Sequence, residues 1–293
     1  MKTLIRNGHI VTATDDYHAD LFIDRGIIVY IGQDLQFLVP AADEVIDASG
    51  LLVLPGGVDV HTHLDMPFGG TTSSDDFFTG TRAAAFGGTT TIIDFAIQQR
   101  GHSVEEALDT WWAKAKYVMS PPLRSPDHAT HLWRGLAGDD LQVVATDHCP
   151  FCMQDQKVLG INNFAKIPNG APGIETRVSL LYDAAIRLNR LSLNRFVEIM
   201  ATMPAKLFGM FPQKGTIAVG SDADLVLFDP QATTTWGVNT AHMQVDYNPF
   251  EGYNAQGKVH MVFSRGEKII ANGQYLGRAG RGKFLKRKTF AAP

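Results

Sequence analysis

The sequence predicts an α/β fold in which a central, barrel-like region is combined with a small β domain built from both ends of the chain. Two observations support this prediction. Residues 1–54 and 213–293 consist mainly of short β-type runs separated by turn signals such as Asn7-Gly8 and Asn272-Gly273. Residues 55–212 instead alternate β-branched runs with segments of helical spacing, a pattern that favours a parallel sheet or barrel.

The runs near the amino terminus are too few and too short to form an independent barrel, so they need partner strands from elsewhere. We expect these strands at residues 3–5, 9–12, 19–23, 27–31 and 44–47. The carboxyl-terminal part offers partners, which we expect at residues 215–219, 225–229, 259–265 and 267–271. The two ends of the chain should therefore meet in one composite β domain.

The central region contains fewer strands than a complete barrel. The apolar run at residues 51–54 leads into a strand that ends near His63, and further strands are expected at residues 89–95, 117–120 and 141–146. Helices are expected at residues 75–86, 103–115, 175–188, 192–202 and 204–208. Because a closed (βα)₈ barrel typically takes about 250 residues, this region predicts a barrel remnant of about four βα units.

The junction between Ala115 and Lys116 also departs from normal chain geometry. A predicted helix ends there and a predicted strand begins, with no glycine, proline, asparagine or aspartate between them. Connections from a helix to a strand normally contain a few turn residues. Either the region is a half-barrel, or a block of the barrel is missing at this junction.

Composition and charge exclude several classes of function. The formal net charge of −4 over 293 residues gives no basic surface for nucleic acid. No apolar run reaches the roughly 18 residues of a membrane span, and Gly8 interrupts the amino terminus before a signal-peptide core can form. We therefore expect a globular, cytoplasmic protein that binds neither nucleic acid nor membrane.

Two histidines at the end of the first central strand are candidates for a metal site. His61 and His63 are two residues apart, so in a strand both side chains point to the same face, about 7 Å apart along its axis. Imidazole is the commonest metal ligand in proteins, and two converging imidazoles can hold one divalent cation. A His-x-His pair alone is a weak signal, so the surrounding motifs decide its meaning.

The motifs around this pair occur in a specific order. Residues 55–63 read Pro-Gly-Gly-Val-Asp-Val-His-Thr-His, and residues 64–71 read Leu-Asp-Met-Pro-Phe-Gly-Gly-Thr. Further motifs follow at residues 75–81, 87–90, 93–95, 119–124, 146–151, 169–173, 220–225 and 247–252. Together they cover nearly the whole chain, which resembles the dihydropyrimidinase (D-hydantoinase) family of the amidohydrolase superfamily.

This resemblance implies an amidohydrolase-type barrel and a metal-dependent hydrolase that opens cyclic amides, such as hydantoins and dihydropyrimidines, at a C–N bond. The first-strand metal ligands of the family fall on His61 and His63. The aspartate that serves the family as both metal ligand and catalytic proton shuttle falls on Asp147. In the complete family site, two Zn²⁺ ions share the hydroxide that attacks the ring carbonyl.

The resemblance also implies where a small cyclic amide would bind. Contacts to the substrate amide fall on the backbone of Ser120 and on Asn169. The loop of residues 64–70 resembles the hydrophobic lid that shapes the pocket for the ring substituent, with Leu64, Met66 and Phe68 as its walls.

Several parts of the family site have no matching motif in this sequence. These are the bridging carboxylated lysine, a histidine on each of the fifth and sixth strands, and the tyrosine that stabilises the oxyanion. The strand at residues 117–120 matches the seventh strand of the family, so the chain resembles a member that lacks barrel units three to six. We then expect one Zn²⁺ or none, and impaired activity. A non-catalytic homologue or scaffold, and an internally deleted gene product, are the alternatives. A homo-oligomer is the assembly that the family suggests.

Three further features have plainer interpretations. Cys149 and Cys152 have redox spacing, but they lie in a Thr-Asp-His-Cys-Pro motif of the family and have no second cysteine pair. His148 is expected to make a supporting hydrogen bond rather than to bind metal. Asp94, at the end of the second strand, is expected to support the histidines without binding the metal itself.

Overall fold

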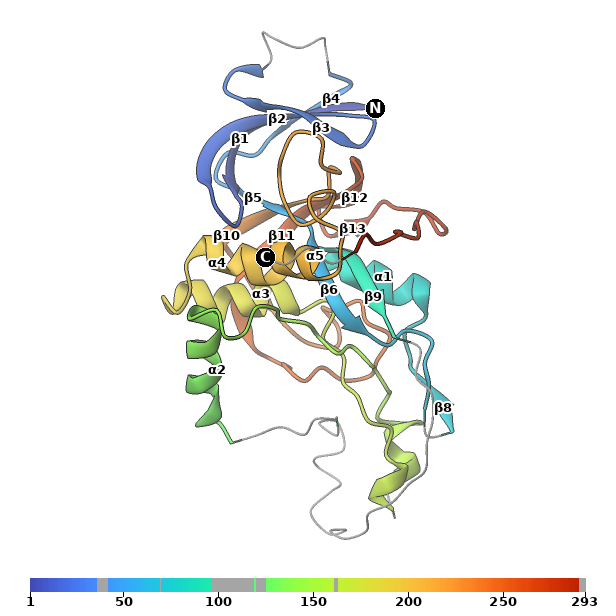
Figure 1. Cartoon of the computed structure of the whole chain (residues 1–293). Coiled ribbons are helices and arrows are strands. Elements are labelled where there is room, and N and C mark those ends of the chain that lie inside the picture. The colour runs from blue at the N-terminus through green and yellow to red at the C-terminus, as the bar shows by residue number, and fades with distance from the viewer. Residues whose placement is uncertain (36–41, 69, 96–118, 120–124, 161–162, 290–293) are drawn as a thin grey trace.

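The computed structural model describes residues 1–35, 42–68, 70–95, 119, 125–160 and 163–289 (Figure 1). The predicted helix at residues 103–115, the strand at residues 117–120 apart from Met119, and the junction between Ala115 and Lys116 lie outside these residues. Among the helices that the structure describes, none is long and apolar enough to cross a membrane.

One large sheet contains strands from both ends of the chain (Figure 1). Its order is β13-β12-β11-β10-β5-β1-β2-β3, and β4 pairs with β1. The central connection is made by β5, which pairs antiparallel with β10 and parallel with β1. The strands are β1 (Lys2–Val11), β2 (Asp16–Asp24), β3 (Ile27–Gly32), β4 (Glu44–Asp47), β5 (Leu52–Pro55), β10 (Leu225–Thr235), β11 (Asn254–Ser264), β12 (Glu267–Ala271) and β13 (Gln274–Tyr275).

Two predicted features of this sheet are wrong. Asn7-Gly8 does not separate two strands: β1 continues through it, with a register shift between Ile5 and Gly8 and a φ of 59° at Asn7. Asparagine tolerates this left-handed conformation, so the strand bulges instead of turning. Residues 215–219 do not form a strand either. Gly215 has a φ of 80°, and its carbonyl accepts a hydrogen bond from Thr202 Oγ1, which directs this segment against a helix.

Helices cover one face of the sheet and form the main core with it. They are α3 (Arg177–Tyr182), α4 (Leu193–Val197) and α5 (Met203–Leu207), with π-helical turns η5 (Asp183–Arg187) and η6 (Glu198–Thr202) following α3 and α4. The predicted helices at residues 175–188, 192–202 and 204–208 are thus confirmed. The fully buried Phe228 of β10 contacts Tyr182, with ring centroids 4.7 Å apart, and Tyr182 meets Phe196 edge-on. Burial of each such side chain contributes about 1.5–3 kcal/mol.

The central region contains a two-stranded parallel sheet. Its strands β6 (Gly57–Thr62) and β9 (Thr89–Asp94) are connected through α1 (Phe77–Phe86). Asp76 caps α1: its side chain accepts a hydrogen bond from Thr79 N, and Thr79 Oγ1 accepts one from Asp76 N. The expected helix and strand on either side of Gly87-Gly88 are therefore confirmed. The remaining elements are the hairpin strands β7 (Pro67–Phe68) and β8 (Thr71–Thr72), the helix α2 (His128–Ala137), and the 3₁₀ turns η3 (Lys157–Gly160) and η4 (Phe164–Lys166).

The strand predicted at residues 141–146 is absent from the structure. Its backbone groups bond elsewhere: Val144 N donates to Ile199 O, and Thr146 N donates to the Asp59 carboxylate. Just beyond it, His148 forms isolated parallel bridges to Thr62 and to Ala171. This segment therefore lies beside β6 without forming a regular ladder with it.

A buried arginine connects the segments of this region. Arg177, at the start of α3, donates hydrogen bonds from its guanidinium to Val58 O, Val144 O and Thr89 Oγ1. Its side chain thus joins β6, β9 and the segment before Asp147. Burying a guanidinium is costly unless hydrogen bonds offset the desolvation, so this arrangement fixes the three segments relative to one another.

Asp183 generates a prediction about stability. Its buried carboxylate accepts hydrogen bonds from Arg187, Tyr253 and Gln256 N, and the Arg187 hydrogen bond is the main reason why its pKa lies at about 2. The folded pKa is below the unfolded value of about 3.9. The stabilisation is therefore complete above the unfolded pKa and is lost as the pH falls through the folded pKa.

We expect Asp183→Asn to lower the free energy of unfolding by about 1.5–3 kcal/mol at pH 7. In denaturant titrations, the difference from the wild type should shrink between pH 4 and pH 2, where the wild-type carboxylate itself becomes protonated. The exposed Asp155→Asn is the matched control. A deficit that stays constant across this pH range would contradict the assignment.

Candidate metal site

Two glycines allow the strand that carries the histidines to lie close to its neighbour. Gly56 and Gly57 precede the histidines, and a Cβ atom added at Gly56 would lie 2.1 Å from Thr90 Oγ1. The parallel pairing of β6 with β9 begins at the register Gly57–Thr89. Larger residues here would push β9 away, so the glycines allow β6 and β9 to pair closely at the start of both strands.

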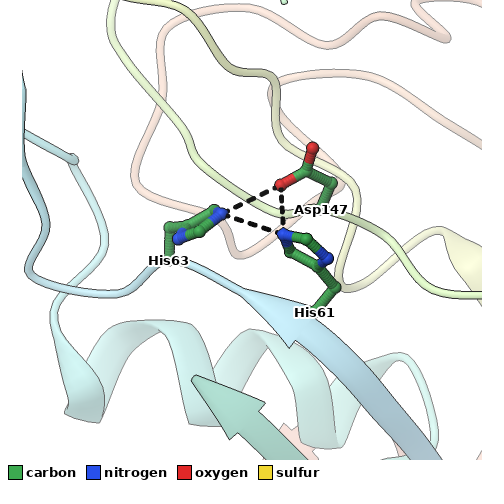
Figure 2. Close-up of side chains that lie close together, drawn as sticks. All are labelled: His61, His63 and Asp147. Atoms are coloured by element: carbon green, nitrogen blue, oxygen red, sulfur yellow. Dashed lines mark hydrogen bonds and ion pairs between the residues drawn. The ribbon is translucent and has the colours of Figure 1, made fainter. Parts of the chain in front are cut away.

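The side chains of His61, His63 and Asp147 converge at the end of β6 (Figure 2). His61 Nε2 lies 3.2 Å from His63 Nε2. Asp147 Oδ1 lies 3.3 Å from His61 Nε2 and 3.1 Å from His63 Nε2. The side chain of His63 is 8% exposed, whereas those of His61 and Asp147 are 44% and 43% exposed. The site is therefore closed on the His63 side and accessible on the other.

The donor atoms fit a single divalent cation. Zn²⁺ binds imidazole nitrogen and carboxylate oxygen at about 2.0–2.2 Å, and two imidazoles with one carboxylate form a recognised catalytic ligand set. Donors at that distance from one ion, about 90–110° apart, are separated by about 3.0–3.5 Å, in agreement with the three measured separations. His61, His63 and Asp147 would therefore hold the ion through Nε2, Nε2 and Oδ1.

Asp59 fixes the two parts of the site relative to each other. Its fully buried carboxylate accepts hydrogen bonds from Thr146 Oγ1 at 2.5 Å, from Thr146 N at 3.2 Å and from His61 N at 3.3 Å. One side chain thus holds the backbone of His61 and that of the residue before Asp147. The sequence patterns above give Asp59 no role, although an acidic residue inside an apolar strand is a signal that could indicate one.

His148 supports the segment after Asp147, as expected. Its Nδ1 accepts hydrogen bonds from Gly173 N at 3.0 Å and Ile174 N at 3.3 Å, so the proton lies on Nε2, which donates to Asp75 Oδ2 at 3.1 Å. His148 O accepts a hydrogen bond from His63 N. A fully buried imidazole thus holds the chain in place, while Asp147 adopts a φ of 50°. Non-glycine residues rarely adopt such a conformation, and functional sites often contain one.

Asp94 acts on the backbone around His63 rather than on an imidazole. Its Oδ1 accepts hydrogen bonds from Thr62 Oγ1 at 2.9 Å and from Leu64 N at 2.8 Å. Within the described residues, His63 Nδ1 is buried without a hydrogen-bond partner. Asp94 therefore positions the residues on both sides of His63, and the expected support reaches the histidine indirectly.

The triad lines a cavity of about 980 Å³ with mainly apolar walls. Met66, Phe68 and Asn169 line this cavity, as do Phe95, Trp133 and Phe250. Phe95 follows β9 and stacks on His61, with ring centroids 4.6 Å apart. Phe95 belongs to the motif at residues 93–95, but its role could not be predicted, because nothing in a sequence shows that the end of β9 lies beside His61.

Two residues expected to contact the substrate, Leu64 and Ser120, are not among the described residues that line the cavity. Leu64 was expected as a lid wall, but it is not among the cavity-lining residues and is buried against α1. A Cβ atom added at Gly80 of α1 would lie 2.3 Å from Leu64 Cδ2, so the missing side chain at Gly80 leaves the space that Leu64 fills. Ser120 lies outside the described residues.

The two cysteines are free thiols, and the structure gives them no role at the triad. Burial raises the pKa of Cys149 to about 12, and burial also raises the pKa of Cys152. Because the thiolate is the form that reacts and binds metal, neither group is poised for redox chemistry. Among the described residues, the triad is the only group of three or more histidine, cysteine or acidic side chains placed to hold a metal.

Comparisons with known proteins identify relatives along the whole chain. The amidohydrolase family model matches residues 117–269. The D-hydantoinase of Streptomyces coelicolor is 32% identical over 460 residues, covering 98% of both proteins. The D-hydantoinase of Geobacillus stearothermophilus is 33% identical and covers 100% of this chain and 98% of its own. The solved structure of a dihydropyrimidinase from Brevibacillus agri matches with a TM-score of 0.92 at 36% identity, and covers 100% of both chains.

These matches also show that an internal part is missing. The alignment with the Streptomyces coelicolor protein extends over 460 residues, whereas this chain has 293. Because the match reaches nearly both ends of each protein, the residues without a counterpart lie inside the relative's sequence.

The geometry of the triad predicts one bound ion per chain. We expect the wild type to bind about one Zn²⁺, measured by elemental analysis and by competition with a chelator. His63→Ala should weaken zinc binding by about 100-fold or more, since even the loss of a residue that only supports a ligand typically costs 10–100-fold. His128→Ala, which removes an exposed histidine on α2, is the control. Equal zinc affinity in the wild type and His63→Ala would contradict the assignment.

Proposed function

Because this chain belongs to the amidohydrolase family, as a relative of the D-hydantoinases and dihydropyrimidinases, we propose that it is a metal-dependent hydrolase of cyclic amides. The proposed substrates are hydantoins and dihydropyrimidines, opened at a ring C–N bond. One observation carries this proposal: two imidazoles and a carboxylate converge within 3.3 Å of one another in a cavity large enough for such a ring.

Hydrolysis needs only water as co-reactant. Its oxygen forms a bond to the ring carbonyl carbon, the C–N bond breaks, and the nitrogen receives a proton, so the single ring-opened product carries a carboxylate and a terminal ureido group. A divalent cation at the triad would supply Lewis-acid chemistry, because it lowers the pKa of a coordinated water and polarises a carbonyl oxygen.

Asp147 is the proposed carrier of the proton. Its Oδ1 faces both imidazoles, while its second carboxylate oxygen points away from them (Figure 2). A carboxylate placed in this way can accept a proton from the attacking water and deliver it to the leaving nitrogen. The hydrogen bonds of Asp59 and His148 to the neighbouring backbone support this assignment, since they restrict where the carboxylate can lie.

The proposed substrate contacts lie in the same cavity. Asn169 carries both an amide donor and an acceptor, which suit the N–H and C=O groups of a ring amide. Met66 and Phe68 would contact a ring substituent, and Phe95 would limit access beside His61. We further assign the backbone of Ser120 to the substrate amide, on the resemblance alone.

We infer that turnover is slower than in the complete relatives. The sequence has no motif for the family's bridging lysine, for two of its histidines or for its oxyanion tyrosine, so one ion would act without these groups. Removing an oxyanion donor alone typically costs about 10²–10³ in rate. We propose that residues 55–212 form a barrel remnant of about four βα units that lacks these groups. Residues 1–54 and 213–293 would form the separate composite β domain.

A non-catalytic homologue is the second candidate function. It is favoured by the same internal gap of the alignment, which leaves much of each relative without a counterpart. The two candidates differ in turnover: a scaffold opens no ring, whether or not it binds zinc.

Ring opening of hydantoin and dihydrouracil by zinc-loaded protein tests the proposal. We expect slow turnover that depends on added Zn²⁺ and falls at least 100-fold in Asp147→Asn, because the carboxamide can neither carry the proton nor replace the charged ligand. Asp155→Asn, an exposed aspartate outside the cavity, should retain the wild-type rate. Zinc-loaded protein that unfolds cooperatively but gives no turnover above the rate in buffer would favour the scaffold.

A further inference from the structure

Lys157 is a buried cation that the proposed reaction does not use. It begins η3, and the residue is 1% exposed. Its ammonium donates hydrogen bonds to Pro168 O at 2.9 Å and to Gly170 O at 2.7 Å. Lysine is among the residues least often fully buried, and an ammonium removed from water needs compensating hydrogen bonds. This position therefore requires a structural or functional explanation.

The two acceptor carbonyls lie on either side of Asn169. Asn169 is the residue between Pro168 and Gly170, and it lines the same cavity as the triad. A single ammonium thus holds the backbone before and after Asn169. We propose that Lys157 is a positioning residue that fixes Asn169 toward the substrate; this inference rests on the proposed function, in which Asn169 contacts the ring amide.

The opposite side of the same segment packs on the chain that follows Asp147. Gly170 has a φ of 145°, and a Cβ atom added there would lie 2.1 Å from Cys149 O. Cys149 N donates a hydrogen bond to Ala171 O at 3.2 Å. Asn169 is therefore held between the Lys157 ammonium and the Cys149 backbone, and its position relative to Asp147 depends on both contacts.

The surroundings of Lys157 keep its side chain in one place. Lys157 N donates to Cys152 O, and its ammonium lies 5.9 Å from the centre of the Phe151 ring. Burial lowers the pKa of Lys157 to about 8, so the group is still mostly protonated at neutral pH. The adjacent Gln156 donates to Thr71 Oγ1 and Thr72 O of the hairpin that carries Phe68. The adjacent residues Gln156 and Lys157 thus connect the β7–β8 hairpin to the backbone on either side of Asn169.

Lys157→Met tests the proposal, because it keeps the length of the side chain and removes the charge and the donors. Lys166→Met is the matched control: it removes an exposed lysine from the same segment. In the zinc-loaded protein, we expect Lys157→Met to raise KM for hydantoin by about tenfold or more, with kcat within about threefold of the wild type and zinc content unchanged. Lys166→Met should match the wild type in all three.

A second readout does not depend on activity. In metal-free protein, backbone amide exchange in residues 163–173 should accelerate at least tenfold in Lys157→Met and not in Lys166→Met, while amides of β1 and β10 keep their wild-type rates. Faster exchange in this segment, without hydantoin binding or turnover in any variant, would reject the proposed function and still support the Lys157 contact. Unchanged exchange and KM in Lys157→Met, or equal effects of both variants, would overturn the inference. A loss of exchange protection throughout the protein, together with loss of bound zinc, in Lys157→Met would also overturn the inference.

Discussion

The hydrogen bonds between Asp59 and Thr146 are the interaction on which the site most depends. His61 lies in β6 and His63 directly follows this strand, whereas Asp147 belongs to an irregular segment with no regular ladder to β6. In this region the Asp59 carboxylate links the two, together with the Arg177 guanidinium, which bonds to Val58 O and Val144 O. Burying these charges would cost several kcal/mol if they were unsatisfied. Their hydrogen bonds offset that cost, and the result is a fixed distance between the ligands.

The same constraint explains how a shortened chain can keep a compact site. The alignments with the relatives extend over about 460 residues from end to end, whereas this chain has 293 residues. The retained strand β6, the segment before His148 and the helix α3 contact one another directly, so the metal ligands do not need the missing part to meet. Under the proposed function, the absent part would supply the family groups for which this sequence has no motif, and turnover would be slower without them.

Much of the fold was predictable because local chemistry determines it. The helical spacing of residues 75–86 and the β-branched run at residues 89–95 placed α1 and β9 with errors of only one or two residues. The sequence could not show that Asn7 would form a bulge, since Asn-Gly serves equally well in a hairpin turn. The strand predicted at residues 141–146 failed for a different reason: its apolar residues match a strand, but Asp59 and a helix carbonyl satisfy its backbone instead.

The candidate site was predictable only as far as its motifs extended. His61, His63 and Asp147 follow from the family resemblance, and the structure brings them together. The roles of Asp59, Phe95 and Lys157 depend on contacts between residues distant in sequence, which no local pattern encodes. Leu64 shows the reverse case, because its expected place in the cavity wall is lost to the space beside Gly80.

The most direct test of this account is a crystal structure of the zinc-soaked protein with an anomalous difference map recorded at the zinc edge. We expect one zinc peak per chain, at about 2.0–2.2 Å from His61 Nε2, His63 Nε2 and Asp147 Oδ1. A peak at any other group of residues, or no peak between these three side chains at saturating zinc, would contradict it.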